Sequence, residues 1–596
     1  MEENKKQGQS MLNGAFILVA ATVLVKVIGA LYKMPLTALI GGVGRGYFTQ
    51  AYEIYTPVYA IAMAGLPVAV SKLVSQEKAL GNYRDIRVIM HTARRIFLLT
   101  GMVATIFLMA IAYPYSKFVI KAPDNFSSIL AIAPSVFFCC CMSSFRGYYE
   151  GLSNMIPTGI SQVIEALGKL VLGLTFANII MKFGLKRYES GQPVFGQIAA
   201  NKAEALSAIY PFTAAGAISG VTIGTLLGLA FLILRHKIVG DHITDAMLAS
   251  SPEAQSSKSW SKMIIVTALP IVAGSLILYV TNLIDTITIK NRLAHAMIVN
   301  ADVIKNMYSA QIAASQTLDS DIATYLYGAY GTALDFKNLI PTITMTLGIS
   351  AIPALSAAWA IKDRVSTKIT IESVIRITML VSLPAGFGLG VLANPILSIV
   401  YNGTNASDVV PIAAGVLATY GFAIFLFALS SPVTNMLQAV GRMDIPLKSM
   451  VAGAVVKIIL NYILVGNPRI NINGAPIGSI ICYIIMVVIN VIMLIRITDV
   501  DIDFKSVFFK PLICAAISCL AALGCYKVFG LLLQDFGDPA SRINGSTIAT
   551  LIAIFAAAFA YIISLLLVKA ISKDDVNMLP KGEKIAKVLE KRGFLG

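Results

Sequence analysis

Charged residues are scarce in this sequence, at 13% of the chain, whereas about a quarter of the residues of a soluble protein are charged. Hydrophobic residues make up 57% of the 596 residues, and the mean hydropathy is +0.77. Apolar runs of about 20 residues, the length at which a helix spans a bilayer, recur along the chain. The composition excludes a soluble globular protein and predicts an all-α polytopic membrane protein.

Motifs for enzymatic chemistry are also missing. The sequence has no GxxxxGK[ST], HExxH or GxSxG pattern, its four histidines are scattered, and its seven cysteines form no CxxC pair. We therefore expect a transporter rather than an enzyme, with no metal and no organic cofactor. Energy would come from a coupling cation such as Na+ or H+, from the membrane potential, or from downstream consumption of the substrate.

Fourteen apolar runs have the length of a transmembrane helix. They lie near residues 11–34, 49–73, 91–113, 128–149, 157–181, 208–234, 262–289, 336–360, 371–400, 411–433, 446–466, 475–497, 508–530 and 546–569. We expect helices 1–6 to form an N-terminal lobe within 1–240 and helices 7–12 a C-terminal lobe within 241–500. Helices 13 and 14 occupy 501–570, and a basic tail follows at 571–596.

The basic residues indicate the orientation of the chain. With a cytoplasmic N-terminus, 29 of the 47 Lys and Arg residues fall in cytoplasmic segments, 14 in external segments and four within spans. Cytoplasmic loops of membrane proteins are enriched in Lys and Arg, so this distribution predicts that both termini are cytoplasmic. The net charge of +16 is then explained by the Lys and Arg residues of cytoplasmic loops, and it does not indicate a nucleic-acid partner.

An internal repeat supports the two-lobe prediction. AGLPVAVSKL at 64–73 resembles SAIPALSAAW at 350–359, and MIPTGISQVIEALGKLVLGL at 155–174 resembles DIPLKSMVAGAVVKIILNYIL at 444–464. The offset is about 285 to 289 residues in both cases. Two halves of six helices would share one orientation and would enclose a central substrate cavity between them.

Ionisable residues inside the spans are the candidate site residues, because such groups are costly in lipid unless they face protein or a water-filled cavity. We predict that six of them line the substrate cavity, namely Lys26, Lys33, Glu53, Asp285, Asp335 and Lys337. Three more are structural or coupling charges, namely Glu165, Lys169 and Lys457.

Each of these assignments has a structural alternative. Lys33 lies near the end of its span and can extend its amine to the interface. Glu165 and Lys169 are four residues apart and can pair within one helix. The remaining charges can form structural pairs across helices, or, for Glu53 and Asp285, bind a coupling cation or proton.

Several stretches together resemble a known family. They are GAFILVAATVLVKVIGALYKMPLTALIG, QAYEIYTPVYAIAMAGLPVAVSKLVSQEKALGN and FRGYYEGLSNMIPTGISQVIEALGKLVLGL. These resemble the oligosaccharide-flippase branch of the multidrug/oligosaccharidyl-lipid/polysaccharide exporter superfamily, in its lipid II flippase and stage V sporulation protein B group. The likeness covers helices 1–5 well and helices 7–12 more loosely.

The resemblance implies a fourteen-helix protein of two lobes that alternates between inward-open and outward-open states. It implies a cationic cavity for a diphosphate, in which Lys26 matches the first basic position of helix 1 and either Tyr32 or Lys33 occupies the second. The stretch of helix 8 around Asp335 and Lys337 matches weakly. A groove at helices 13 and 14 would hold the lipid tail.

Our first hypothesis is a flippase in the bacterial cytoplasmic membrane that moves a polyprenyl-diphosphate-linked oligosaccharide, with the peptidoglycan precursor lipid II favoured. Its partners would be the bilayer, the lipid-linked sugar and the cell-wall synthesis machinery. The alternatives are a cation-coupled multidrug antiporter of the same fold, a flippase for another cell-envelope polysaccharide precursor, and a non-transporting scaffold. A cavity for cationic drugs would be acidic, and a cavity for a diphosphate would be basic.

Overall fold

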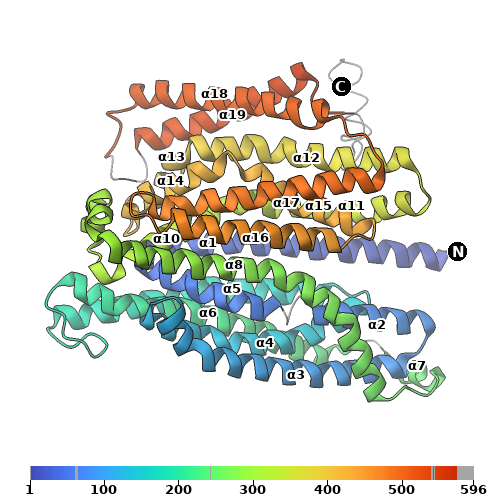
Figure 1. The fold of residues 1–596 in the computed structure, drawn as a ribbon. Coiled ribbons are helices and arrows are strands. Elements are labelled where there is room, and N and C mark those ends of the chain that lie inside the picture. The colour runs from blue at the N-terminus through green and yellow to red at the C-terminus, as the bar shows by residue number, and fades with distance from the viewer. Residues whose placement is uncertain (1, 61–64, 242, 539–540, 542–543, 573–596) are drawn as a thin grey trace. The chain divides into compact units, whose positions relative to one another are not determined.

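The computed structural model describes residues 2–60, 65–241, 243–538, 541 and 544–572 (Figure 1). Within these ranges, the description leaves out the side chains of 2–20, 23, 30, 270–271, 273–278, 280–281 and 346–354. The described residues are almost entirely helical, and their only β-structure is a single bridge between Val194 and Gln197. The all-α prediction is confirmed.

The chain forms two compact units. Unit 1 comprises Met1–Ala294 and Ile312–Gly328, and unit 2 comprises His295–Gln311 and Ala329–Gly596. These units are defined by packing, whereas the predicted boundary at residue 240 rests on the internal repeat. That boundary, with those of the other predicted domains, stays a prediction.

Unit 1 is built from long helices. They are α1 (Glu2–Ala60), α2 (Leu66–Leu80), α3 (Tyr83–Pro114), α4 (Phe126–Gly151), α5 (Ile156–Glu189), α6 (Lys202–Ile238), the short α7 (Asp245–Ser250) and most of α8 (Ser257–Met307). A π-helical turn η2 (Tyr115–Val119) and a 3-10 turn η3 (Pro123–Asn125) join α3 to α4. Part of α9 (Ser309–Ser315), the turn η4 (Asp319–Asp321) and the start of α10 (Ile322–Lys337) complete the unit.

Unit 2 includes His295–Gln311 and the end of α10, and the rest of it also consists of helices. They are α11 (Leu339–Ala360), α12 (Arg364–Val391), α13 (Ala393–Tyr401), α14 (Val410–Gly421), α15 (Ile424–Ala439), α16 (Asp444–Leu464), α17 (Gly474–Thr498), α18 (Lys510–Leu532) and α19 (Gly545–Val568). Short turns η5 (Ser407–Val409), η6 (Asn471–Asn473) and η7 (Lys505–Phe509) precede α14, α17 and α18.

Local sequence explains several of the helix ends. Asn201 caps α6 by accepting a hydrogen bond from the Glu204 backbone amide at 2.9 Å. Asn544 caps α19 in the same way, at 2.9 Å from the Thr547 amide. At the other end of a helix, Gly81 terminates α2 in the left-handed conformation that favours glycine. These are the cap residues that helix termini prefer, so the caps are readable from the sequence.

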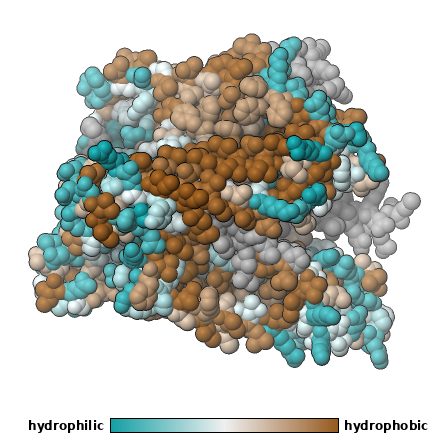
Figure 2. Space-filling model, in the orientation of Figure 1, coloured by the Kyte–Doolittle hydropathy of each residue, from teal (hydrophilic) through white to brown (hydrophobic). Residues whose placement is uncertain are grey.

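Ten described helices are long and apolar enough to cross a membrane, and the bent pair of α14 and α15 makes eleven if it is one span. The predicted number of fourteen is consistent with this set, because α1 covers the first predicted span and about half of the second. Figure 2 shows a broad apolar surface over α16 and α17, with hydrophilic residues toward the helix ends. Exposed Val451, Val455 and Ile459 follow one another at intervals of four along α16, which is the pattern of a lipid-facing stripe.

The glycine-rich stretch GGVGRGYF at 41–48 looks like a flexible external turn in the sequence, and that interpretation is wrong. Residues 41–50 are buried, and the backbone departs from helical geometry only at Gly41, with φ 64° and ψ −175°. Only glycine adopts this combination readily, so one residue suffices to break α1 into two helical segments. Gly46 packs instead against Thr324 of α10, where a larger side chain would clash.

Close helix packing fixes the faces of α1, α5 and α6 in unit 1. A Cβ atom at Gly220 of α6 would overlap the backbone of Gly173 in α5. A Cβ atom at Gly173 would also lie 3.0 Å from the ring of Tyr32 in α1, and the Tyr32 hydroxyl donates to the Ala217 carbonyl at 3.1 Å. Small residues at such contacts let membrane helices approach closely, and they orient the neighbouring polar residues of α5.

Candidate functional site

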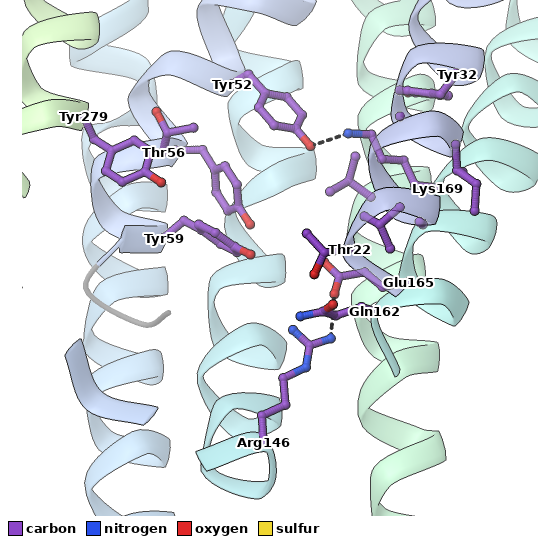
Figure 3. Close-up of a pocket in the computed structure, with 16 residues that line it drawn as sticks. Thr22, Tyr32, Tyr52, Thr56, Tyr59, Arg146, Gln162, Glu165, Lys169 and Tyr279 are labelled. Atoms are coloured by element: carbon purple, nitrogen blue, oxygen red, sulfur yellow. Dashed lines mark hydrogen bonds and ion pairs between the residues drawn. The ribbon is translucent and has the colours of Figure 1, made fainter. Parts of the chain in front are cut away.

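A cavity of about 400 Å³ lies inside unit 1, between α1, α4, α5, α6 and α8 (Figure 3). It is lined by Thr22, Val25, Ile28, Gly29, Tyr32, Tyr52, Tyr55, Thr56, Tyr59, Arg146, Gln162, Glu165, Ala166, Lys169, Val221 and Tyr279. Three of these residues are charged and five are tyrosines. The cavity therefore carries charged and hydroxyl groups on a largely apolar wall between membrane helices.

Both segments of α1 contribute to the wall. In the first segment, Thr22, Val25, Gly29 and Tyr32 recur at intervals of three and four, so they share one helix face. Gly41 then changes the direction of the chain, and the second segment returns to the cavity. One stretch of sequence thereby supplies two walls.

Tyrosines form a continuous aromatic series along the second segment of α1. The ring centroids of Tyr52 and Tyr55 are 5.7 Å apart, and those of Tyr55 and Tyr59 are 5.2 Å apart. Phe48 stacks on Tyr52 at 5.1 Å and also lies 6.1 Å from Tyr32 of the first segment. Such contacts hold the rings in place while their hydroxyl groups remain polar.

Lys169 of α5 lies among these tyrosines. Its Nζ donates to the Tyr52 hydroxyl at 2.8 Å, and it lies 5.0 Å from the Tyr32 ring centroid and 4.7 Å from that of Tyr52. Aromatic faces attract cations, and the attraction grows when water is excluded. The two segments of α1 thus hold an ammonium group at the cavity wall.

The other two charges form a buried ion pair. Nη2 of Arg146 in α4 lies 3.0 Å from Oε2 of Glu165 in α5, and the Arg146 side chain is only 3% exposed. Arg146 Nε also donates to the Ser161 hydroxyl at 3.0 Å. A charge this deeply buried requires such partners, because removing it from water is costly.

These contacts bear on the expected pairing of Glu165 with Lys169. In the described contacts, Glu165 accepts from Arg146 of α4 and Lys169 donates to Tyr52 of α1. The i,i+4 spacing permits a pair within α5, but other helices supply partners that face the same cavity. Both residues connect α5 to its neighbours.

Neither of the two lysines predicted to line the cavity from helix 1 is among the lining residues of this cavity. Lys26 is exposed and lies outside the residues that line this cavity, although its neighbours Val25 and Gly29 belong to them. Lys33 is half-buried and follows the lining residue Tyr32. A role for either lysine in a central cavity stays a prediction.

The predicted carboxylates Glu53 and Asp285 both belong to unit 1 and are half-buried. Glu53 follows the lining residue Tyr52 in α1 but does not itself line the cavity. Asp285 lies in α8 beside Thr286, whose hydroxyl group lies 2.8 Å from that of Tyr327 in α10. Their proposed role in ion coupling also stays a prediction.

The remaining predicted residues belong to unit 2. Lys337 lies 4.9 Å from the Tyr420 ring centroid and 4.2 Å from that of Phe427, so aromatic rings hold this cation as they hold Lys169. Asp335 is half-buried in α10, and Lys457 is buried in α16. Of the nine predicted residues, the unit 1 cavity contains Glu165 and Lys169.

Sequence reasoning named Tyr32 as a candidate through the family resemblance, but it missed Arg146, Gln162 and the other four tyrosines. Arg146 counts as a loop cation in the topology prediction because it lies near the end of a predicted span. Glu165 could have pointed to Arg146, because a carboxylate inside a membrane span needs a cation from its own helix or from a neighbouring one. The spacing of Tyr52, Tyr55 and Tyr59 also places three aromatic rings on one helix face.

The cavity can bind a polar ligand through charge and hydrogen bonds. Two cations and one carboxylate line it, together with hydroxyl groups and the Gln162 amide. Among the described residues, no group of three or more His, Cys, Asp or Glu side chains is placed to hold a metal ion. The arrangement suits the binding and release of a polar ligand.

Two family models match the chain. The polysaccharide biosynthesis protein family matches residues 11–310, and the lipid II flippase MurJ family matches residues 307–534. Together they extend from the first predicted span into the thirteenth.

Individual relatives match over most of their length. Stage V sporulation protein B of Bacillus subtilis (strain 168) is 22% identical over 581 residues, which cover 96% of this chain and 98% of that protein. The lipid II flippase MurJ of the same organism is 23% identical over 500 residues, 82% of each chain. A solved structure of lipid II flippase MurJ in an inward closed conformation is similar in fold, with a TM-score of 0.58, 15% identity, and coverage of 93% of this chain and 98% of that one.

The first family model covers half of the chain, and the relatives match along nearly all of it. The chain therefore belongs to the polysaccharide biosynthesis protein family, in the flippase group of the multidrug/oligosaccharidyl-lipid/polysaccharide exporter superfamily, and it is a membrane transporter, not an enzyme.

Proposed function

We propose that this protein moves a polyprenyl-diphosphate-linked oligosaccharide across the bacterial cytoplasmic membrane, and that its substrate is the peptidoglycan precursor lipid II. Family membership supports a lipid-linked sugar as the substrate class. The similarity to a protein named lipid II flippase supports the particular lipid. Flipping would proceed by alternating access, with both termini in the cytoplasm and with cell-wall synthesis enzymes using the product.

The observation that carries the proposal is the sign of the charge in the unit 1 cavity. Arg146 and Lys169 contribute two positive charges, and Glu165 contributes one negative charge. An anionic diphosphate is attracted by a net positive cavity, and charge-assisted hydrogen bonds are strongest where water is scarce. A multidrug antiporter for cationic compounds would need the opposite sign, so the cavity disfavours that alternative.

Lys169 is the residue best placed to bind a phosphoryl oxygen. Its ammonium group lines the cavity and donates to the neutral hydroxyl of Tyr52 at 2.8 Å. A compact ammonium can exchange such a partner for a phosphate oxygen without moving the helix. Arg146, by contrast, is tied to Glu165 and Ser161 and holds α4 against α5.

Transport needs a source of energy, and we propose a cation gradient or the membrane potential. Glu53 and Asp285 are half-buried carboxylates in unit 1 and are the candidates to bind a coupling Na+ or H+. Purified protein in vesicles would reveal the source. Substrate flipping should follow an imposed Na+ gradient, pH gradient or potential, and the Glu53→Gln and Asp285→Asn variants should lose that dependence.

Depletion of the protein followed by lipid analysis tests the substrate. We expect lipid II to accumulate on the inner leaflet, and re-expression of the wild-type protein should clear it. Accumulation of a different undecaprenyl-linked sugar would retain the flippase but replace lipid II as the substrate. Unchanged lipid-linked sugars together with increased sensitivity to cationic drugs would support the antiporter instead.

A further inference from the structure

A second cavity lies in unit 2, where the turn between α11 and α12 meets the end of α17. It has a volume of about 300 Å³, and its lining includes Trp359, Lys362, Arg364, Thr367 and Asp499. None of these residues belongs to the unit 1 cavity or is needed for the proposed flipping reaction. The positive-inside prediction places this turn on the cytoplasmic side of the membrane.

The charges of this cavity are mixed and accessible. Arg364 Nη1 lies 2.9 Å from Asp499 Oδ2, and both side chains are 73% exposed. Ion pairs this exposed contribute little to stability, so either partner can be exchanged for a ligand group. Lys362 is also exposed and adds a second cation. A ligand carrying one phosphate and one ammonium group would satisfy all three charges.

Other carboxylates near the turn already have partners. Asp363 caps α12 by accepting hydrogen bonds from the backbone amides of Val365 and Ser366, each at 3.0 Å. Glu372 accepts from the Asp503 amide at 2.9 Å and lies 3.8 Å from Lys368. Asp499 lines the cavity, and its own pair with Arg364 is exposed and can be exchanged, so this carboxylate can meet an ammonium group; the indole of Trp359 can add a cation–π contact.

An apolar stripe leads away from the charged residues. Val365 and Ile369 lie four residues apart at the start of α12, and both are exposed; Ile361, in the turn that precedes α12, is exposed as well. On a helix this spacing puts Val365 and Ile369 on one face. A soluble phosphate compound has no apolar chain to pack against these residues, whereas the acyl chains of a lipid would pack along them. A tryptophan at the same level is typical of the membrane interface.

We propose that this cavity binds the headgroup of a zwitterionic aminophospholipid of the phosphoethanolamine type. The phosphate accepts hydrogen bonds from Lys362 and Arg364, which are donors suited to phosphate oxygens. The ammonium group pairs with Asp499, and the acyl chains lie along the exposed Val365 and Ile369 of α12. The site would hold a membrane lipid against unit 2 whichever sugar lipid the protein transports.

Native mass spectrometry of the delipidated full-length protein tests this assignment. Phosphatidylethanolamine, phosphatidylglycerol and soluble phosphoethanolamine would be titrated separately. We expect phosphatidylethanolamine to bind most tightly, and Lys362→Gln and Asp499→Asn each to weaken it about tenfold. Lys362→Arg should retain binding. Arg442→Gln is the matched control, because Arg442 forms an exposed ion pair with Asp444 outside the cavity, and it should leave binding unchanged.

Three results would overturn the proposal. Equal weakening by Arg442→Gln would show that overall charge, not this cavity, binds the lipid. Tighter binding of phosphatidylglycerol, strengthened by Asp499→Asn, would show a site for anions only. Binding of soluble phosphoethanolamine as tightly as the lipid would exclude a role for the apolar stripe. Unchanged thermal stability of each variant would show that the fold is intact.

Discussion

The buried pair of Arg146 and Glu165 gives a prediction whose size follows from its surroundings. Replacing Glu165 with Leu leaves the Arg146 guanidinium in a site where it is 3% exposed. Breaking a buried pair in this way costs about 3–5 kcal/mol. We expect about 3 kcal/mol, the lower end of that range, because Ser161 still accepts from Arg146 Nε and because Glu165 is itself 22% exposed.

The double variant Arg146→Met/Glu165→Leu should recover most of that loss. Apolar side chains of similar size remove both desolvation costs at once, so we expect the double variant to lie within about 1 kcal/mol of the wild type. The measurement is the free energy of unfolding in mild detergent for the wild type, both single variants and the double variant.

The exposed pair of Arg442 and Asp444 provides the control, at 44% and 42% exposure. Replacing both of those residues should change stability by less than about 1 kcal/mol. The reasoning would be refuted if Glu165→Leu cost no more than the control. It would also be refuted if the losses of the two single variants added in the double variant, because additivity would mean that the residues do not interact.

Three further predictions concern transport and the path of α1. Lys169→Gln should reduce flipping about tenfold or more, whereas Lys169→Arg should retain much of it, because the substrate diphosphate needs the charge. Equal flipping rates in vesicles for the wild type and both variants would contradict this role. Lys26→Ala should lose lipid II export while Lys26→Arg keeps it, and normal growth of cells that carry only the alanine variant at normal expression would remove Lys26 from the site. Gly41→Ala should destabilise the protein by about 1–3 kcal/mol, because φ 64° with ψ −175° is strained for any residue with a Cβ atom. Gly524→Ala in α18, which meets nothing within 4 Å, should be neutral or stabilising when the free energy of unfolding of both variants is measured in mild detergent.

The helical class of the protein could be predicted because its cause is local. A run of about 20 apolar residues forms a membrane helix wherever it occurs, since the bilayer leaves no other partner for the backbone. The predicted spans from 91–113 onward to 208–234 each coincide with one long helix. The transporter class, which the family comparisons support, could also be predicted from local features, because catalytic motifs are short sequence patterns that can be searched for directly.

The candidate site was harder to predict, because a charge chooses its partner in three dimensions. The sequence shows that Glu165 and Lys169 are four residues apart, and this spacing allows a pair. It does not show that α4 brings Arg146 to Glu165 or that α1 brings Tyr52 to Lys169. The break in α1 was hard to predict for a similar reason. The glycine-rich stretch at 41–48 predicts that the helix is interrupted, but it does not show that Gly41 alone interrupts it.

The sequence by itself determined that this protein crosses a membrane many times, that it carries a few costly intramembrane charges, and that it resembles a flippase family. The tertiary structure decided which charges meet. It placed Lys169, Arg146 and Glu165 around one tyrosine-lined cavity, left Lys26 exposed outside that cavity, and formed a second cavity from two turns more than a hundred residues apart. Hydrophobic run length is a property of the chain, whereas the pairing of buried charges depends on which helix faces pack together.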